Sequence, residues 1–451
     1  MNAVISPTAT PDGSVGGTSK LELDTAGLQA AVTGTISTNT SRDTEPGAPP
    51  VVQAVTDSGS WTRAQLGVSA QADGPLGSKI AVTGQDQVSQ SVSPYAAGAA
   101  PQVLETQALS GTIIATLPLL PDLDAQVGSA ASQSSTRNAT VDGADASHLQ
   151  TGDTQISTGL SWRVLPQVTV DGGVTVERQD ADLDGDVADS ASFSYVKPKA
   201  GVTVTPWQGS TVKLGAEQAV DPLNGANYMA LASLSDRPQD LKIAPDHAWQ
   251  YQASIDQKFG AASISASVTQ GQNGSATELA PVSGGQTPAS VAMKKKQNAT
   301  VAFSLPLEGF GLSDTQLQSQ ATWRHSLVRD PVTGEYRRAN GEVPREASVN
   351  LTKNLPGASN TKIGLSGQLA TTQEFYQVSQ TTQMKTAPRL GAFLSYAPGP
   401  IAMDVRVDGL MGGAQQFTDT FYEGSRNGPV SGTNSHKAGD AHISFSFSKK
   451  M

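Results

Sequence analysis

The sequence predicts an all-β fold, an antiparallel transmembrane β-barrel with about 18 strands visible and a range of roughly 16 to 22. Three observations predict this class. Apolar residues recur with a period of two, short turns alternate with long polar connections, and the chain is poor in both charge and apolar residues. Its 451 residues are 37% apolar and 16% charged, whereas soluble domains carry roughly 25% charged residues.

The strand pattern is clearest in residues 168–176, where Val168, Val170, Gly172, Val174 and Val176 alternate with polar residues. The same alternation occurs in 156–164, 349–351 and 401–407. Such a period places one set of side chains on each face of a strand. A wide barrel has a wet interior and needs apolar side chains only on its lipid-facing side. No segment combines a helical period with helix caps, so we expect no helix.

The connections alternate in length along the whole chain. Eight short turns rich in Gly and Pro are predicted at 72–79, 117–122, 163–167, 205–210, 258–263, 305–314, 354–360 and 396–400. Long polar stretches lie between these hairpins, at 37–60, 129–152, 178–191, 270–297, 370–387 and 412–438. An opening strand near Leu21–Ile36 and a closing strand at Ala441–Met451 complete the predicted set. Transmembrane barrels have short turns at one rim and long loops at the other, whereas a soluble β-sandwich has more uniform connections.

The sequence predicts two parts of the chain, a short N-terminal segment and the barrel. We expect residues 1–18 to be a disordered N-terminal segment and residues 19–451 to form the barrel. The N-terminus has neither a basic region nor an apolar core, so this chain carries no export signal that we recognise. The longest apolar stretch, Thr112–Leu120, is too short for a membrane helix and contains a proline. Either the protein is cytoplasmic, or its true beginning precedes Met1.

Two groups of residues are predicted to serve the membrane. In the last strand Ile443, Phe445 and Phe447 alternate with polar residues, and Met451 is the final residue. A terminal amphipathic strand of this kind resembles the outer-membrane assembly signal, and the alternative is an ordinary edge strand. The tryptophans expected at the membrane interface are Trp162, Trp249 and Trp323. The alternative is a soluble β core, which the low aromatic content of 5% leaves open.

Several stretches in residues 190–451 resemble the barrel of TonB-dependent outer-membrane receptors. Leu241–Ala253 is similar to a segment of the form L-x-P-E-x-x-W-x-Y-E-x, with Asp246 in place of the Glu, and it is the most specific match. Weaker matches are Phe193–Lys199, Val328–Glu335, Phe421–Asn427 and the ending FSFSKKM, whose Met451 replaces the usual terminal aromatic. No plug domain and no TonB box are recognised in the sequence.

The resemblance implies a location in the outer membrane of a Gram-negative cell, among lipid and lipopolysaccharide. It further implies uptake of an unknown scarce small ligand, such as a ferric siderophore. TonB is a partner only if a plug and a TonB box are encoded upstream. The alternatives are a passive plugless porin and a β-rich surface protein that transports nothing.

Chemistry of other kinds is not expected. The chain has no cysteine, and its five histidines are scattered. We therefore predict no catalytic, cofactor-binding or metal-binding residues, and no enzyme. The net charge of −10 argues against a nucleic-acid partner. Asp180, Asp182 and Asp184 match the start of a calcium loop without its closing Glu, and a solvated acidic loop is preferred. The resemblance also implies that Arg329, Asp330 and Glu335 lie at or beyond a strand end; solvation is preferred there, and ligand contact is the alternative.

Overall fold

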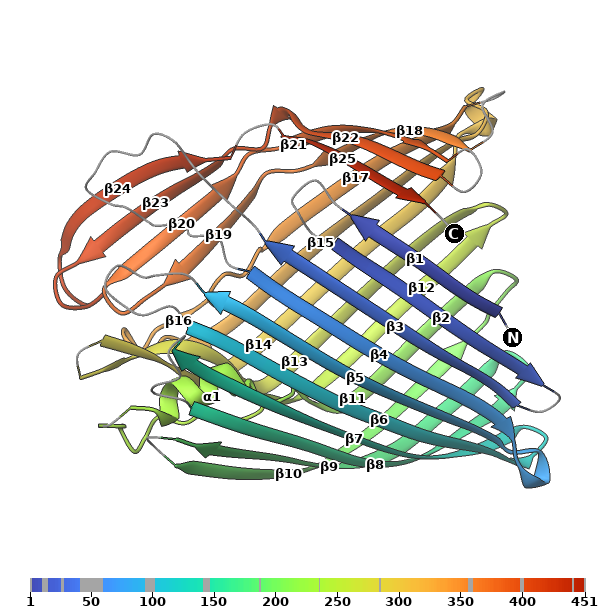
Figure 1. The fold of residues 1–451 in the computed structure, drawn as a ribbon, viewed down its shortest axis with the longest axis horizontal. Coiled ribbons are helices and arrows are strands. Elements are labelled where there is room, and N and C mark those ends of the chain that lie inside the picture. The colour runs from blue at the N-terminus through green and yellow to red at the C-terminus, as the bar shows by residue number, and fades with distance from the viewer. Residues whose placement is uncertain are drawn as a thin grey trace.

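The structure is a computed structural model of the chain. It describes residues 2–9, 15–25, 28–40, 60–93, 102–140, 147–185, 188–234, 236–283, 285–355, 360–397, 401–439 and 442–449. Most of these residues lie in β-strands that form a barrel (Figure 1).

The elements follow one another in chain order. They are β1 (Asn2–Ala9), β2 (Val15–Thr25), β3 (Leu28–Thr40), β4 (Ser60–Asp73), η1 (Pro75–Gly77), β5 (Lys79–Ser93), β6 (Gln102–Leu120), β7 (Leu123–Thr140), β8 (Ser147–Leu165), β9 (Val168–Asp184), β10 (Asp189–Val204), β11 (Ser210–Val220), α1 (Gly225–Ala232), β12 (His247–Phe259), β13 (Ala262–Val282), β14 (Gly285–Pro306), η2 (Glu308–Phe310), β15 (Thr315–Arg329), β16 (Tyr336–Arg337), β17 (Arg345–Asn354), β18 (Thr361–Gln368), β19 (Thr371–Tyr376), β20 (Gln380–Thr386), β21 (Arg389–Tyr396), β22 (Ile401–Gly412), β23 (Gln415–Tyr422), β24 (Val430–Ala438) and β25 (His442–Lys449).

One antiparallel sheet closes on itself to form the barrel. Among the described residues it has 21 strands, one of which is the two-residue β16. From β1 to β15 each strand pairs with the next one along the chain. The ring then continues from β15 through β17, β18, β21, β22 and β25. It closes where β25 pairs with β1, with Ala9 opposite Phe447. This pairing joins the first and last strands of the sheet, and the predicted fold class is confirmed.

The short turns lie at one rim of the barrel. All eight predicted turns join consecutive antiparallel strands, namely β4–β5, β6–β7, β8–β9, β10–β11, β12–β13, β14–β15, β17–β18 and β21–β22. Because the strands run alternately up and down, these turns share a rim, and the N and C marks lie at that end in Figure 1. The opposite rim, which we call the mouth, carries the longer connections.

The strands in the first residues differ from the pattern expected from the sequence. Leu21–Ile36 is not one strand, because β2 ends at Thr25 and β3 begins at Leu28. The segment 1–18, predicted to be disordered, contains β1 and the beginning of β2. The backbone of β1 pairs with β2 on one side and with β25 on the other. A strand is stabilised there by its partners in the closed ring, although its own residues show little strand pattern.

The polar stretches between hairpins are largely strands rather than loops. Residues 129–152 include parts of β7 and β8, and residues 270–297 belong to β13 and β14, which are 21 and 22 residues long. Stretches 370–387 and 412–438 contain β19, β20, β23 and β24, which form a separate four-stranded sheet beyond the mouth (Figure 1, upper left). A hydrogen-bonded ladder uses backbone groups, so polar side chains do not stop it.

The helix α1 shows which face of the wall is the interior. It contacts β8 and β9, and also β14, which lies several strands further round the ring. A segment that touches such separated positions on a closed ring must cross its interior. Leu149, Ala181 and Leu183 pack in one buried cluster with Leu231 of α1, and so point inward. No helix was expected from the sequence; α1 is capped by Asn224, the residue before it, whose side chain accepts a hydrogen bond from the Asn227 backbone N–H at 3.0 Å.

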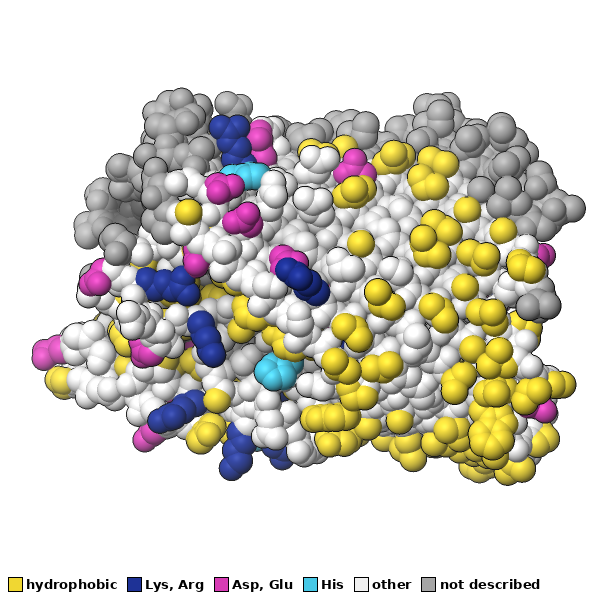
Figure 2. Space-filling model, turned by 90° about the horizontal axis from the view of Figure 1, so that it is seen from below, with side chains coloured by type: hydrophobic (Ala, Val, Ile, Leu, Met, Phe, Trp, Pro, Cys, Tyr) yellow, Lys and Arg dark blue, Asp and Glu magenta, His cyan; other side chains and the backbone are white. Residues whose placement is uncertain are grey.

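The outward face of β9 changes character at one point. It is apolar from Val168 to Val176, and then carries Arg178, Asp180 and Asp182. The apolar part is about as long as the 9–11 residues that a tilted strand needs to cross a bilayer. Figure 2 shows the same division on one face of the barrel, with apolar side chains gathered toward the short-turn rim and charged ones toward the mouth. Among the described residues, no helix is long and apolar enough to span a membrane.

Candidate ligand site in the barrel mouth

The connection between β11 and β12, residues 221–246, folds into the mouth. Its base is closed by the Asp221 N–H, which donates to the Asp246 carbonyl at 2.8 Å. The Asp246 carboxylate accepts hydrogen bonds from the Ser275 backbone N–H at 2.5 Å and from the Ser275 hydroxyl at 3.2 Å. On the opposite side Gln179 accepts from the Leu223 N–H at 2.9 Å. The connection is therefore tied to β13 and to β9 at once.

The helix in this connection packs on an apolar part of the inner wall. Leu149, Leu183 and Leu231 are almost fully buried in one cluster with Tyr228 and Ile243. The inner face of β9 is polar at the level of the outer apolar band and becomes apolar where α1 covers it, at Ala181 and Leu183. The outer face has the opposite order. This inversion places a small hydrophobic core inside the mouth.

A cavity of about 640 Å³ lies between α1 and the wall. A volume of this size is typical of small-molecule sites. Its walls come mainly from the inner faces of β6 to β9, including Thr106, Ser134, Thr136, Asn138 and Thr151, and its cover comes from Leu223, Ala226, Met229, Ala230 and Ser233. A larger hollow of about 880 Å³ is lined mostly by outward-facing residues of the same strands, such as Gly111 and Gly152, and therefore lies on the outer face of the barrel.

Buried polar residues border this cavity. Glu177 and Gln179 are adjacent inward positions of β9, and both are almost fully buried. The Glu177 carboxylate is in contact with the Lys197 ammonium and the Gln179 side-chain amide. Asp153 lines the cavity, lies opposite Gln179 in the ladder and is close enough to Glu177 for that carboxyl group, after burial, to raise the pKa of Asp153. The carboxyl groups of Asp153 and Glu177 are therefore close together, with Lys197 as the cation beside them.

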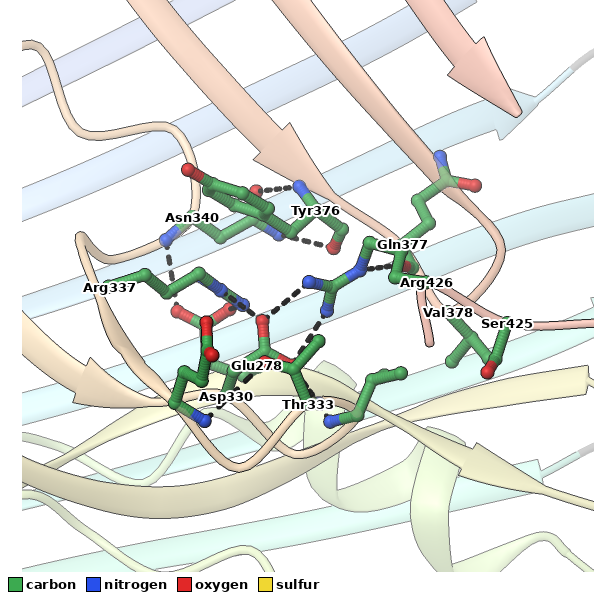
Figure 3. A network of polar contacts seen from close by, with 12 residues as sticks. Glu278, Asp330, Thr333, Arg337, Asn340, Tyr376, Gln377, Val378, Ser425 and Arg426 are labelled. Atoms are coloured by element: carbon green, nitrogen blue, oxygen red, sulfur yellow. Dashed lines mark hydrogen bonds and ion pairs between the residues drawn. The ribbon is translucent and has the colours of Figure 1, made fainter. Parts of the chain in front are cut away.

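A second group of buried charges joins segments that are distant in the sequence (Figure 3). Arg426 donates to both oxygens of Asp330, at 2.6 and 2.8 Å. Arg337 contacts Asp330 as well and donates to Glu278 at 2.7 Å. The Arg337 guanidinium also lies 3.9 Å from the ring centre of Tyr376. Two guanidiniums thus face two carboxylates, with the charges balanced. We call Glu278, Asp330, Arg337, Tyr376 and Arg426 the arginine–carboxylate network.

The environment shifts the pKa values in this network. Burial alone would raise the pKa of Asp330, but Arg426, Arg337 and the backbone N–H groups of Val332 and Thr333 outweigh it and hold that pKa well below its usual range. Burial and the neighbouring Glu374 raise the pKa of the Tyr376 hydroxyl. At neutral pH the Asp330 carboxylate is therefore ionised, and the Tyr376 hydroxyl keeps its proton.

The network fixes the four-stranded sheet against the rest of the mouth. Asn340 accepts from the Tyr376 N–H at 3.0 Å, and its own N–H donates to Glu278 at 2.9 Å. The Arg426 Nε donates to the Gln377 carbonyl at 2.6 Å. Glu278 lies on β13, Asp330 and Asn340 in the connection after β15, and Arg426 in the connection after β23. The result is a rigid wall on one side of the mouth.

The predicted solvation of Asp330 is wrong. The carboxylate is 1% exposed, because two arginines enclose it. Arg329 and Glu335, its neighbours in the same predicted stretch, are exposed. Two stretches that resemble the receptor family, Val328–Glu335 and Phe421–Asn427, meet here through Asp330 and Arg426. Sequence reasoning missed this pair, since the two residues are 96 positions apart.

The residues predicted at the membrane interface remain predictions. Trp162, Trp249 and Trp323 are exposed. In β25, Ile443, Phe445 and Phe447 lie opposite Val407, Val405 and Met403 of β22. Met451 lies outside the described residues. No group of three or more His, Cys, Asp or Glu side chains in the described ranges is arranged to hold a metal ion.

Solved structures of transporters and receptors share this fold. The copper transporter OprC matches with a TM-score of 0.71 at 12% identity, over 100% of this chain and 80% of its own. The FrpB iron transporter from Neisseria meningitidis has a TM-score of 0.63 at 10% identity, over 100% and 81%. The alcaligin outer-membrane receptor FauA from Bordetella pertussis has 0.60 at 10%, over 100% and 75%.

At these identities the likeness concerns the fold. The chain has the barrel fold of TonB-dependent outer-membrane receptors, and the predicted resemblance is confirmed at that level. No protein-family model matches the sequence, and no curated protein matches it.

Proposed function

We propose that this protein is an outer-membrane receptor of a Gram-negative cell that captures a scarce small ligand in its mouth and takes it up in an energised, TonB-dependent manner. The observation that carries the proposal is the cavity of about 640 Å³ between α1 and the inner wall, at the mouth of a closed barrel. A concave, sheltered site with convergent polar groups is the usual form of a small-molecule site.

Three features support the membrane part of the proposal. The outer face of β9 has an apolar band that ends at Arg178. Exposed apolar side chains are abundant on the outer faces of β8, β9 and β12. The structures with the same fold include an outer-membrane receptor and transporters of copper and iron. A ferric siderophore is one example of a scarce ligand, and the charge of the cavity bears on that choice below.

A gene deletion tests the function without knowledge of the ligand. The host and a strain lacking this gene are grown in the same defined medium, and solutes in the spent media are compared by mass spectrometry. We expect at least one solute to be depleted by the host and left by the deletion strain, with depletion abolished by a protonophore. Depletion that persists with the protonophore indicates a passive porin. Identical spent media would refute uptake altogether.

A further inference from the structure

The walls of the mouth cavity carry hydrogen-bonding groups without positive charge. Among the described residues that line it, none is Lys, Arg or His. The hydroxyl and amide side chains on the strand side include Thr106, Ser134, Thr136, Asn138, Thr151 and Gln179. Such a set recognises hydroxyl or amide groups of a ligand. It offers no cation to an anionic ligand, which would have to give up its hydration on entering the mouth.

The acidic side chains at the cavity are not all neutralised. Asp180 forms an ion pair with Arg178, with Nε and Oδ2 2.9 Å apart. Glu177 is paired with Lys197. Asp153 has no ion pair of its own in the described part of the chain, and burial together with the neighbouring Glu177 raises the pKa of Asp153 to about 6, so that it is mostly ionised at neutral pH. The acid pair of Asp153 and Glu177 thus shares one ammonium, and one carboxyl group is left for a cation supplied from outside.

The cation that fits is organic rather than a bare metal ion. A metal site needs several ligands around one point, and the described residues contain no cluster of three or more candidate side chains. An ammonium group can pair with a single carboxylate, because its other N–H donors bond to hydroxyl groups or water. The remaining volume and the hydroxyl-bearing walls suit a ligand with several hydroxyl groups.

We infer that the mouth cavity binds a hydroxylated organic cation, whose cationic group pairs with Asp153 and whose hydroxyl groups bond to the Ser, Thr, Asn and Gln side chains of β6 to β9. The biological meaning of this site rests on the proposed uptake function. The inference excludes anionic metal chelates as ligands of this cavity.

The test compares three trisaccharide-sized probes that differ in charge: kanamycin as the cation, maltotriose as the neutral probe and trigalacturonate as the anion. The full chain is refolded from inclusion bodies into a zwitterionic detergent, so that no lipopolysaccharide competes for kanamycin. Binding is measured by isothermal titration calorimetry. We expect kanamycin to bind most tightly and trigalacturonate not to bind.

Two variants locate the site. Asp153→Asn removes the charge while keeping the shape, and we expect kanamycin to bind roughly ten- to a hundredfold more weakly, as for the loss of a charge-assisted hydrogen bond. Ala226→Trp keeps the charge and fills the cavity from α1, so it should abolish binding. The matched control is Asp171→Asn, which removes an inward carboxylate of β9 outside the cavity and should leave binding unchanged. Heat-modifiable gel migration verifies that each variant folds.

The outcomes separate this inference from the proposed function. Equal binding of the three probes, or kanamycin binding that survives both Asp153→Asn and Ala226→Trp, overturns the inference, as does the absence of kanamycin binding to the unmodified chain. In each of those cases the deletion experiment still decides whether the protein takes up a solute. If kanamycin binds through Asp153 but the deletion strain depletes every solute as the host does, the cation site is supported and the proposed uptake function is refuted.

Discussion

Replacing Asp330 by Asn is expected to release the four-stranded sheet from the mouth without unfolding the barrel. The Asp330 carboxylate is 1% exposed and accepts hydrogen bonds from Arg426 and Arg337. Removing one partner of a buried ion pair costs about 3–5 kcal/mol, because the remaining charge stays buried. At about 1.4 kcal/mol for each tenfold change, the open population of this region should rise roughly 100- to 4,000-fold.

Trypsin provides the assay, since Arg426 is itself a cleavage site and its side chain is only 6% exposed. The rate of cleavage after Arg426, followed by mass spectrometry under mild conditions, tracks the open population when opening is faster than cleavage. Asp180→Asn is the matched control, because it removes a carboxylate from an exposed pair with Arg178. That variant should be cleaved after Arg426 at the rate of the unmodified chain. An increase of less than about tenfold in Asp330→Asn would refute the reasoning about the network.

The acid limit of the network follows from the sign of the pKa shift. The pKa of Asp330 is lowered in the folded protein, so its stabilisation is complete above the ordinary Asp value of about 3.9. It is lost as the pH falls below that value toward the folded pKa. Hydrogen exchange of the Arg426 and Val378 amides should therefore show constant protection from pH 8 to about 4, after correction for intrinsic rates. Protection that falls near pH 6 would contradict the shift.

Three further predictions concern the apolar outer face of the barrel, the helix α1 and the buried cluster around α1. Leu160→Arg, on the lipid-facing side of β8, should lower barrel stability in vesicles by about 2–4 kcal/mol, whereas the adjacent inward Ser161→Arg should cost much less; equal effects in urea unfolding would argue against the assigned faces. Gly225→Val should displace α1 and widen the mouth, because a Cβ there would lie 2.8 Å from Leu149; unchanged protection of α1 in hydrogen exchange would argue against this. Tyr228→Phe removes a buried hydroxyl that lies near Asp189 but, within the described part of the chain, makes no hydrogen bond of normal geometry, so the urea midpoint should not fall; a clear fall would show that the hydroxyl is bonded.

The turns were the most predictable part of the fold. Each of the eight is encoded by Gly and Pro residues within a few positions, and these residues set the backbone angles locally. The strand 168–176 was equally clear, since its alternation needs no information from elsewhere in the chain. Strand lengths were not predictable, because β13 and β14 extend as far as backbone pairing continues and not as far as apolar residues do.

The candidate site was not predictable in the same way. Asp330 and Arg426 belong to stretches that were singled out separately, and nothing local to either shows that the two meet. The helix α1 was missed because its apolar residues match an inner-wall patch and not a periodic pattern of its own. In the sequence, Asp153 and Glu177 look like ordinary polar residues of two separate strands. Only the register of β8 and β9 makes them neighbours on the inner face of the barrel.

The sequence by itself determined that the chain forms paired strands with an apolar band on one face, because period-two alternation and turn chemistry act within a few residues. The tertiary structure decided everything that depends on closing the ring. Closure makes β1 a strand, brings Arg426 to Asp330 and turns one face of β9 into an interior wall that α1 can cover. These outcomes depend on which distant segments become neighbours, and burial then sets which charges must pair.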